Sequence, residues 1–107
     1  MISIDDFKKI EIKIGEIMSA ERIPETDKLL KLGVNFGEAE QRLIISGIAE
    51  YYASESLVGK KCAFVANLEP RTIRGLESNG MILAVSDGET FSLLTPDQKI
   101  IPGSTIR

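Results

Sequence analysis

Residues 60–84 of the chain read KKCAFVANLEPRTIRGLESNGMILA, and this stretch decides the fold. It contains two apolar runs typical of strands, Cys62 to Ala66 and Met81 to Val85, joined by a polar connection with Pro and Gly. Beside the single anion Glu69, the first part of the stretch carries four cations: Lys60, Lys61, Arg71 and Arg74. Short polar side chains follow or precede the apolar runs: Asn67, Ser78 and Asn79. This combination predicts the rim of a β-sheet that holds a polyanion.

The charge of the whole chain contrasts with that of this stretch. The formal net charge is -3 and the isoelectric point is about 5.0, which argues against a protein coated in positive charge for non-specific nucleic-acid binding. Residues 38–55 carry four acids and one base, whereas residues 60–74 reverse that ratio. The segregation permits a local basic face on an acidic molecule.

Length and composition bound the class of protein. With 107 residues, 43% of them hydrophobic, we expect one globular domain spanning residues 1–107. No apolar run approaches the ~18 residues of a membrane span, and no leader-like segment is recognisable at the start. The lone Cys62 has no partner within the chain, which favours a reducing compartment. We therefore expect a cytoplasmic protein without a membrane association.

Apolar residues alternate with polar ones along several segments, as in half-buried strands. The first segment runs from Ile10 through Ile17, and Gly15 at its change of phase predicts a β-bulge. Before it, Ser3 is a suitable N-cap for a short helix. The remaining strands are expected at residues 30–36, 43–46, 62–66, 81–86 and 90–94, with a helix-like or irregular segment between residues 48 and 59.

The first five of these strands, three before the helical segment and two after it, follow the order of the oligonucleotide- and oligosaccharide-binding (OB) barrel, and residues 90–94 add the second arm of a last hairpin. We therefore expect an all-β protein, a five-stranded OB barrel with short helices. A generic small β-barrel also fits the periodicity.

The residue inventory argues against catalysis. The chain has no His, which is the commonest general base and a frequent metal ligand. One Cys and scattered carboxylates give no metal-ligand spacing, and the nine Gly form neither a P-loop nor a dinucleotide-binding pattern. We expect no enzyme activity, no metal and no cofactor.

Seven short segments, taken in order, resemble one family. They are Phe7 to Gly15, Pro24 with Asp27 to Leu30, Arg42 with Ser46 to Ile48, Leu57 to Lys61, Asn67 to Pro70, Arg74 with Gly75, and Ser78 to Met81. Together they cover nearly the whole chain and are similar to the tRNA-binding domain. That family includes a free-standing dimeric protein and the C-terminal appendix of methionyl-tRNA synthetase. The resemblance implies an OB barrel, tRNA as the ligand, no catalysis, and a homodimer formed by the terminal segments.

Three cations are the first candidates for contacts with phosphates, which supply much of the affinity of nucleic-acid binding: Lys28, Arg42 and Arg74. The alternative for each is an ordinary solvated surface cation. Arg74 stands beside Gly75 in a segment that resembles the family, and this favours a functional role.

Three further candidates carry short-range recognition. Asn67 can donate and accept hydrogen bonds at a base edge or ribose, or it can cap the turn before Pro70. Ser78 can contact a phosphate or 2′-hydroxyl, or it is a turn residue. Met81 can offer a polarisable surface to a base, or it belongs to the core. The four Phe are all expected in the core.

Both chain ends carry more apolar residues than a barrel interior needs: Ile2, Ile4, Phe7, Ile10, Leu93, Leu94, Ile100, Ile101 and Ile106. They form either an extra layer over the barrel or a homodimer interface. The function we expect is a non-catalytic module that recognises tRNA by shape and backbone. The alternative is a protein-interaction module that docks an aminoacyl-tRNA synthetase.

Overall fold

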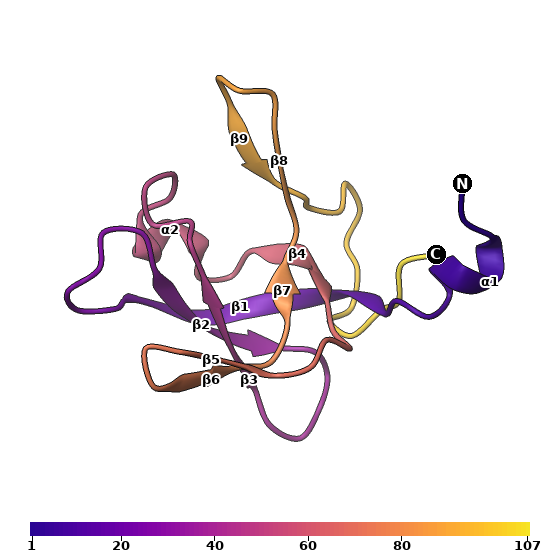
Figure 1. Cartoon of the computed structure of the whole chain (residues 1–107), viewed down its shortest axis with the longest axis horizontal. Helices are drawn as coiled ribbons and strands as arrows, with labels where there is room; N and C mark the ends of the chain where they lie inside the picture. The colour runs from indigo at the N-terminus through magenta and orange to yellow at the C-terminus, as the bar shows by residue number, and fades with distance from the viewer.

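A computed structural model describes residues 1–107 and shows an all-β, nearly closed barrel with two very short helices (Figure 1). Five antiparallel strands form its sheet in the order β3-β2-β1-β4-β7. Their bounds are β1 (Ile12–Arg22), β2 (Leu30–Asn35), β3 (Arg42–Ser46), β4 (Lys61–Val65) and β7 (Met81–Ile82). The remaining elements are α1 (Ile4–Phe7), α2 (Ser54–Leu57), β5 (Arg71–Ile73), β6 (Leu76–Ser78), β8 (Ala84–Ser86) and β9 (Phe91–Leu93). The five-stranded OB-type barrel predicted from the sequence is confirmed.

The core follows from strict alternation along the strands. In β2, Leu30, Leu32 and Val34 are fully buried, whereas the residues between them are only partly covered. They pack with Ile17, Ile44, Leu57, Phe64 and other apolar side chains in one cluster. Phe36 and Phe64 meet edge to face there, with ring centroids 5.3 Å apart. The prediction that all four Phe are core residues is only partly right, because Phe7 and Phe91 are only partly buried, although Phe91 packs against the core cluster.

The bulge in β1 lies at a different residue from the one expected. The register passes from Ile17 opposite Val34 to Ser19 opposite Gly33, so Met18 is the extra residue and not Gly15. Gly15 has another role, because a Cβ there would lie 2.6 Å from Val34 Cγ1. The absence of a side chain at Gly15 leaves room for Val34, Phe36 and Phe64 in the core. From the sequence alone, a Gly needed for close packing cannot be told from a Gly in a bulge.

The connection between the two apolar runs contains a hairpin that the sequence analysis did not predict. Strands β5 and β6 pair with Ile73 opposite Leu76, which leaves Arg74 and Gly75 as a two-residue turn. At the end of β6, the chain joins β3 through two hydrogen bonds. The amide of Asn79 donates to the carbonyl of Leu43 at 2.8 Å, and the amide of Ile45 donates to Ser78 Oγ at 2.9 Å. The hairpin is therefore fixed to the barrel at its base.

The two chain ends lie together at one end of the barrel (Figure 1). Helix α1 begins after Ser3, whose Oγ accepts a hydrogen bond from the amide of Asp6 as expected of an N-cap. The C-terminal segment pairs antiparallel with the start of β1 through Lys13 and Thr105. No residue of α1 is buried, and Ile4 in particular is exposed to solvent.

Candidate nucleic-acid interface

The loop between β1 and β2 is short and internally bonded. The amide of Thr26 donates to the carbonyl of Ile23 at 3.3 Å, and the Thr26 hydroxyl donates to the same oxygen at 3.1 Å. Arg22 Nη2 donates to the carbonyl of Asp27 at 3.1 Å. Glu25 has a φ of 66°, a conformation that usually requires Gly or Asn at this place in a turn. The loop is thus held in one shape, at some cost in backbone strain.

The tip of the β5–β6 hairpin holds the second non-glycine residue with a positive φ, Arg74. Arg74 and Gly75 have φ values of 53° and 79°, as a type I′ turn requires at both central residues. Gly adopts this conformation freely, whereas Arg does so at a cost of about 1–2 kcal/mol. Glu25 and Arg74 are the two non-glycine residues with positive φ in the chain.

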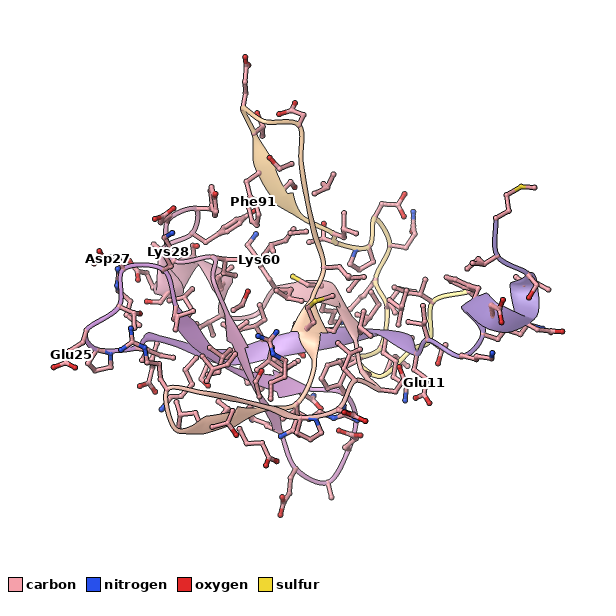
Figure 2. All side chains as sticks on the ribbon, in the orientation of Figure 1. Glu11, Glu25, Asp27, Lys28, Lys60 and Phe91 are labelled. Carbon is pink, nitrogen blue, oxygen red and sulfur yellow. The ribbon has the colours of Figure 1, made fainter.

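These two loops, far apart in the sequence, meet. They enclose a shallow hollow of about 360 Å³ on the surface, which we call the Lys28–Arg74 hollow and which is lined by Glu25, Thr26, Asp27, Lys28, Leu29 and Arg74. Figure 2 shows Glu25, Asp27 and Lys28 at the end of the molecule opposite the chain termini. In OB barrels, the loop after the first strand and the loop before the last strand flank the usual nucleic-acid site. The hollow lies between these two loops.

Lys28 and Arg74, two of the expected contact residues, are exposed and take part in none of the four ion pairs of the chain. Both cations are therefore free to meet an anion. The hollow also carries the carboxylates of Glu25 and Asp27, which the sequence analysis did not single out. The signal for them was the Pro24-Glu25 pair, a turn signal in front of the Asp27-Lys28 segment. The hollow is thus mixed in charge.

Arg42 is bound within the molecule. Its Nε and Nη2 donate to the two carboxylate oxygens of Glu38 at 2.9 and 2.8 Å, and Nη1 donates to the carbonyl of Ala66. The guanidinium also lies over the ring of Phe36, 5.1 Å from its centroid. Hydrogen bonds from Arg42 hold the pKa of Glu38 below its usual value. Three of its five N–H groups are used within the molecule, and its charge is paired with Glu38, so Arg42 is less free to meet an anion than Lys28 or Arg74.

Asn67 and Ser78 are also engaged in intramolecular bonds. Asn67 Oδ1 accepts from the amide of Glu11 at 2.9 Å, and its Nδ2 donates to the carbonyl of Lys9 at 2.7 Å. This amide group ties the segment between α1 and β1 to the end of β4. Ser78 is 4% exposed and accepts the amide hydrogen of Ile45 at the barrel seam. Met81 differs from both, because 46% of it is exposed on β7.

The remaining chemistry of the chain is sparse. No group of three or more His, Cys, Asp or Glu residues is placed to hold a metal ion. Cys62 is fully buried, and burial raises the pKa of its thiol to about 11, so it is not a nucleophile at neutral pH. None of the helices is long and apolar enough to cross a membrane.

Comparison with known proteins places this chain in a family. Residues 12–105 match the family model tRNA_bind, described as "Putative tRNA binding domain". The methionine–tRNA ligase of Methanoregula boonei is 53% identical over 107 residues, and all of this chain aligns with 16% of that ligase. The ligase of Thermotoga maritima is 47% identical over 105 residues, and the chain again spans 16% of its length.

A solved structure confirms the likeness in three dimensions. The MetRS-related protein of Pyrococcus horikoshii superimposes with a TM-score of 0.92 and 36% identity, covering 100% of this chain and 98% of that one. The sequence comparisons and the structural comparison thus point to the same family. The chain belongs to the tRNA-binding domain family, and it is homologous to a part of methionyl-tRNA synthetases.

Proposed function

We propose that this domain binds folded tRNA without catalysing a reaction, and that the Lys28–Arg74 hollow is a main point of contact. The observation that carries the proposal is the meeting of two unpaired cations from distant segments at the two loops where OB barrels bind nucleic acids. Two cations at a rigid edge suit the phosphates of an RNA backbone, which fix register and supply affinity.

Two kinds of role follow for the six residues expected from the sequence. Lys28 and Arg74 contact phosphates at the hollow. Met81, which is exposed on β7 and does not line the hollow, offers its thioether as a separate apolar contact. The other three act indirectly, by holding the surface in shape through their intramolecular hydrogen bonds: Arg42, Asn67 and Ser78. The carboxylates of Glu25 and Asp27 repel phosphates that are not placed beside Lys28 or Arg74. They can also accept hydrogen bonds from ribose hydroxyls.

The backbone strain supports this assignment. Positive φ at Glu25 and Arg74 costs free energy, and strained residues of this kind cluster at binding sites where function requires their placement. Both strained residues line the same hollow. A loop selected only for stability would carry Gly or Asn at these two positions.

The test is the salt dependence of tRNA binding. Each phosphate contact contributes about one unit to the slope of log affinity against log salt concentration. Arg74→Asn removes the charge while keeping a side chain that tolerates positive φ, so the hairpin is preserved. We expect Arg74→Asn and Lys28→Gln each to weaken total-tRNA binding in a gel shift and to reduce the slope by about one.

Arg74→Lys is the matched control, because it keeps the charge and should keep the slope. A second control is Lys9→Gln, which removes an exposed cation paired with Asp6 at the other end of the molecule. If Arg74→Asn and Lys28→Gln bind tRNA with the affinity and slope of the unmodified protein, the hollow is not the site.

The proposal extends to assembly. The chain spans 16% of its synthetase relatives, so we infer that the domain acts free-standing or as part of, or docked to, a methionyl-tRNA synthetase, where it raises the local concentration of tRNA. A cytoplasmic location belongs to the same proposal.

We also infer a homodimer that buries the terminal face, by which we mean the exposed apolar side chains of both chain ends: Met1, Ile2, Ile4, Ile10, Leu94 and Ile101.

A protein-interaction module is the second candidate, and one observation favours it. A groove of about 350 Å³ beside the terminal face is lined largely by apolar side chains, among them Ile14, Leu94, Ile100 and Ile106. One structural neighbour, from Picrophilus torridus, is named a CsaA chaperone protein; it has a TM-score of 0.89 and 32% identity over the whole of both chains. Absence of any tRNA complex at moderate salt, together with co-purification of a protein partner, would favour this candidate.

A further inference from the structure

An exposed pair of stacked aromatic rings lies outside the hollow. The rings of Tyr51 and Phe91 are 4.0 Å apart and within 11° of parallel. Tyr51 lies in the connection between β3 and α2. Phe91 is the first residue of β9, directly after the turn of the β8–β9 hairpin. Tyr51 remains 55% exposed although Phe91 covers one of its faces. The open surface of Tyr51 therefore includes its other face.

This pair is held in place by its surroundings. The amides of Tyr51 and Tyr52 both donate to the carbonyl of Ile48, a buried residue, at 3.0 and 3.1 Å. Tyr52 packs edge to face with Phe91, and its hydroxyl accepts the amide hydrogen of Leu93 at 3.1 Å. The backbone of Tyr51 and the ring of Phe91 are thus held by contacts that leave the other face of Tyr51 free. A pre-ordered aromatic face loses little entropy when a planar ligand covers it.

The stack is connected to the proposed RNA site. The amide of Ala49 donates to the carbonyl of Lys28 at 2.9 Å, so the Tyr51 segment lies directly against the loop that forms the hollow. In Figure 2, Lys28 and Phe91 both lie toward the α2 side of the barrel. An RNA that reaches the Lys28 side chain therefore passes close to the open face of Tyr51.

We propose that the open face of Tyr51 is a stacking site for a nucleobase, one that is unpaired or turned outward on the tRNA bound at the Lys28–Arg74 hollow. Every base has a π-face, and stacking on an aromatic side chain is independent of sequence. Tyrosine suits an exposed position of this kind, since its ring is apolar and its hydroxyl remains in water. The inference rests on the proposed function, because it takes the ligand to be tRNA.

Removal of the ring should weaken tRNA binding at every salt concentration. Loss of one base–aromatic stack corresponds to a decrease of at least about fivefold in affinity. Because stacking releases no counterion, Tyr51→Leu should leave the salt slope unchanged, unlike Lys28→Gln and Arg74→Asn. Tyr51→Phe keeps the ring and should bind tRNA like the unmodified protein.

A direct readout separates base contact from a structural role of the stack. The chain contains no Trp, so Tyr51→Trp introduces a single indole that can be excited beyond the absorption of RNA. We expect added tRNA to quench its fluorescence. Phe7→Trp, in α1 at the other end of the molecule, is the control and should show no quenching.

Three outcomes decide between the possibilities. Quenching of the Tyr51→Trp indole, with weaker binding by Tyr51→Leu at an unchanged slope, supports the stacking site. If the unmodified protein binds tRNA but the indole is not quenched, the stacking site is overturned and the proposed function stands. A loss of affinity in Tyr51→Leu then reflects a loosened β8–β9 hairpin. Faster hydrogen exchange of the Leu93 amide would show that loosening. If the unmodified protein binds no tRNA, both are overturned.

Discussion

The ion pair between Arg42 and Glu38 links the β2–β3 connection to the start of β3. Both oxygens of Glu38 accept from the guanidinium, and the pKa of this carboxyl is lowered chiefly for that reason. A carboxyl with a lowered pKa in the folded state stabilises the fold above its unfolded pKa, and this contribution is lost as the pH falls through the folded value. Glu38 is 41% exposed, so solvent screening keeps the contribution small.

We therefore predict a pH-dependent difference between the unmodified protein and Glu38→Gln. The unmodified protein should be the more stable above the ordinary pKa of about 4.5, and the difference should shrink as the pH falls below that value. Urea unfolding at a series of pH values measures it. A difference that persists unchanged at the acid end would show that the charge of Glu38 is not responsible.

Ser78 is predicted to act through stability. Ser78→Ala leaves the amide of Ile45 without its partner at the buried seam of the barrel, which should lower the free energy of unfolding by about 1–3 kcal/mol. Ser92→Ala is the matched control, because that exposed hydroxyl bonds only the carbonyl of the next residue. Equal denaturation midpoints for the two variants would contradict this role.

Polar residues near strand ends were the least predictable part of the site. For Asn67 and Ser78 the sequence left a binding role and a turn role open. For Arg42 it left a phosphate contact or a solvated surface cation, and the intramolecular role was not expected. Only the positions of distant backbone groups decide between the two, as with the carbonyls of Lys9 and Ala66. Lys28 and Arg74 were easier, since a cation beside a turn residue is generally exposed.

Among the elements, the β5–β6 hairpin shows why short strands escape sequence patterns. Each strand has three residues, too few for alternation to be recognised, and Pro70 precedes them. The available signal was the Arg74-Gly75 pair between apolar Ile73 and Leu76. That signal is weak because type I′ turns are usually marked by Asn-Gly or Asp-Gly.

Gly75 is predicted to be required by this turn. Gly75→Ala places a side chain at a φ of 79°, which should cost about 1–2 kcal/mol although no neighbouring atom obstructs the new Cβ. We expect a lower unfolding free energy and weaker tRNA binding, since the strain distorts the turn that presents Arg74. Gly47→Ala is the control, because its Cβ is equally unobstructed and its φ is not in the positive range.

Longer elements were predicted well, with one displaced feature. The alternation in residues 30–36 and the apolar run at residues 62–66 predicted β2 and β4 to within one residue at each end. The β1 bulge was assigned to Gly15 because Gly is common in bulges, whereas the structure has it at Met18. Gly15 is required because Val34 of β2 and Phe36 just after it occupy the space of a side chain. The sequence pattern of β1 does not show which distant residues will pack against Gly15.

For the whole molecule, the order of the strands predicted a small β-barrel and the family resemblance implied its OB form, but neither decided what the chain ends do. The apolar residues of the termini were expected either to close the barrel or to form a dimer. The C-terminal segment does pair with β1, yet the terminal face stays open in the single chain, with Ile2 and Ile4 about two-thirds exposed at 68% and 66%. This favours a partner.

We predict a homodimer in solution, with a mass of twice the 11.7 kDa of one chain. Ile4→Asp and Ile101→Asp place charges on the terminal face and should shift the equilibrium to monomers with little change in the fold, because both side chains are exposed. Native mass spectrometry with and without tRNA gives the number of subunits and of bound RNA molecules. Val85→Asp, on the β8–β9 hairpin, serves as the control.

The adjacency of the two termini has a consequence for how the domain can be tethered. The amide of Ile106 donates to the carbonyl of Ile12, and residues of α1 line one cavity together with Thr105 and Ile106. A longer polypeptide attached at either end would leave the barrel from the same pole, whereas the β1–β2 loop lies at the opposite end (Figure 1). A short linker from Arg107 to Met1 would equally allow circular permutation, with new ends opened at the exposed Asp87-Gly88 tip.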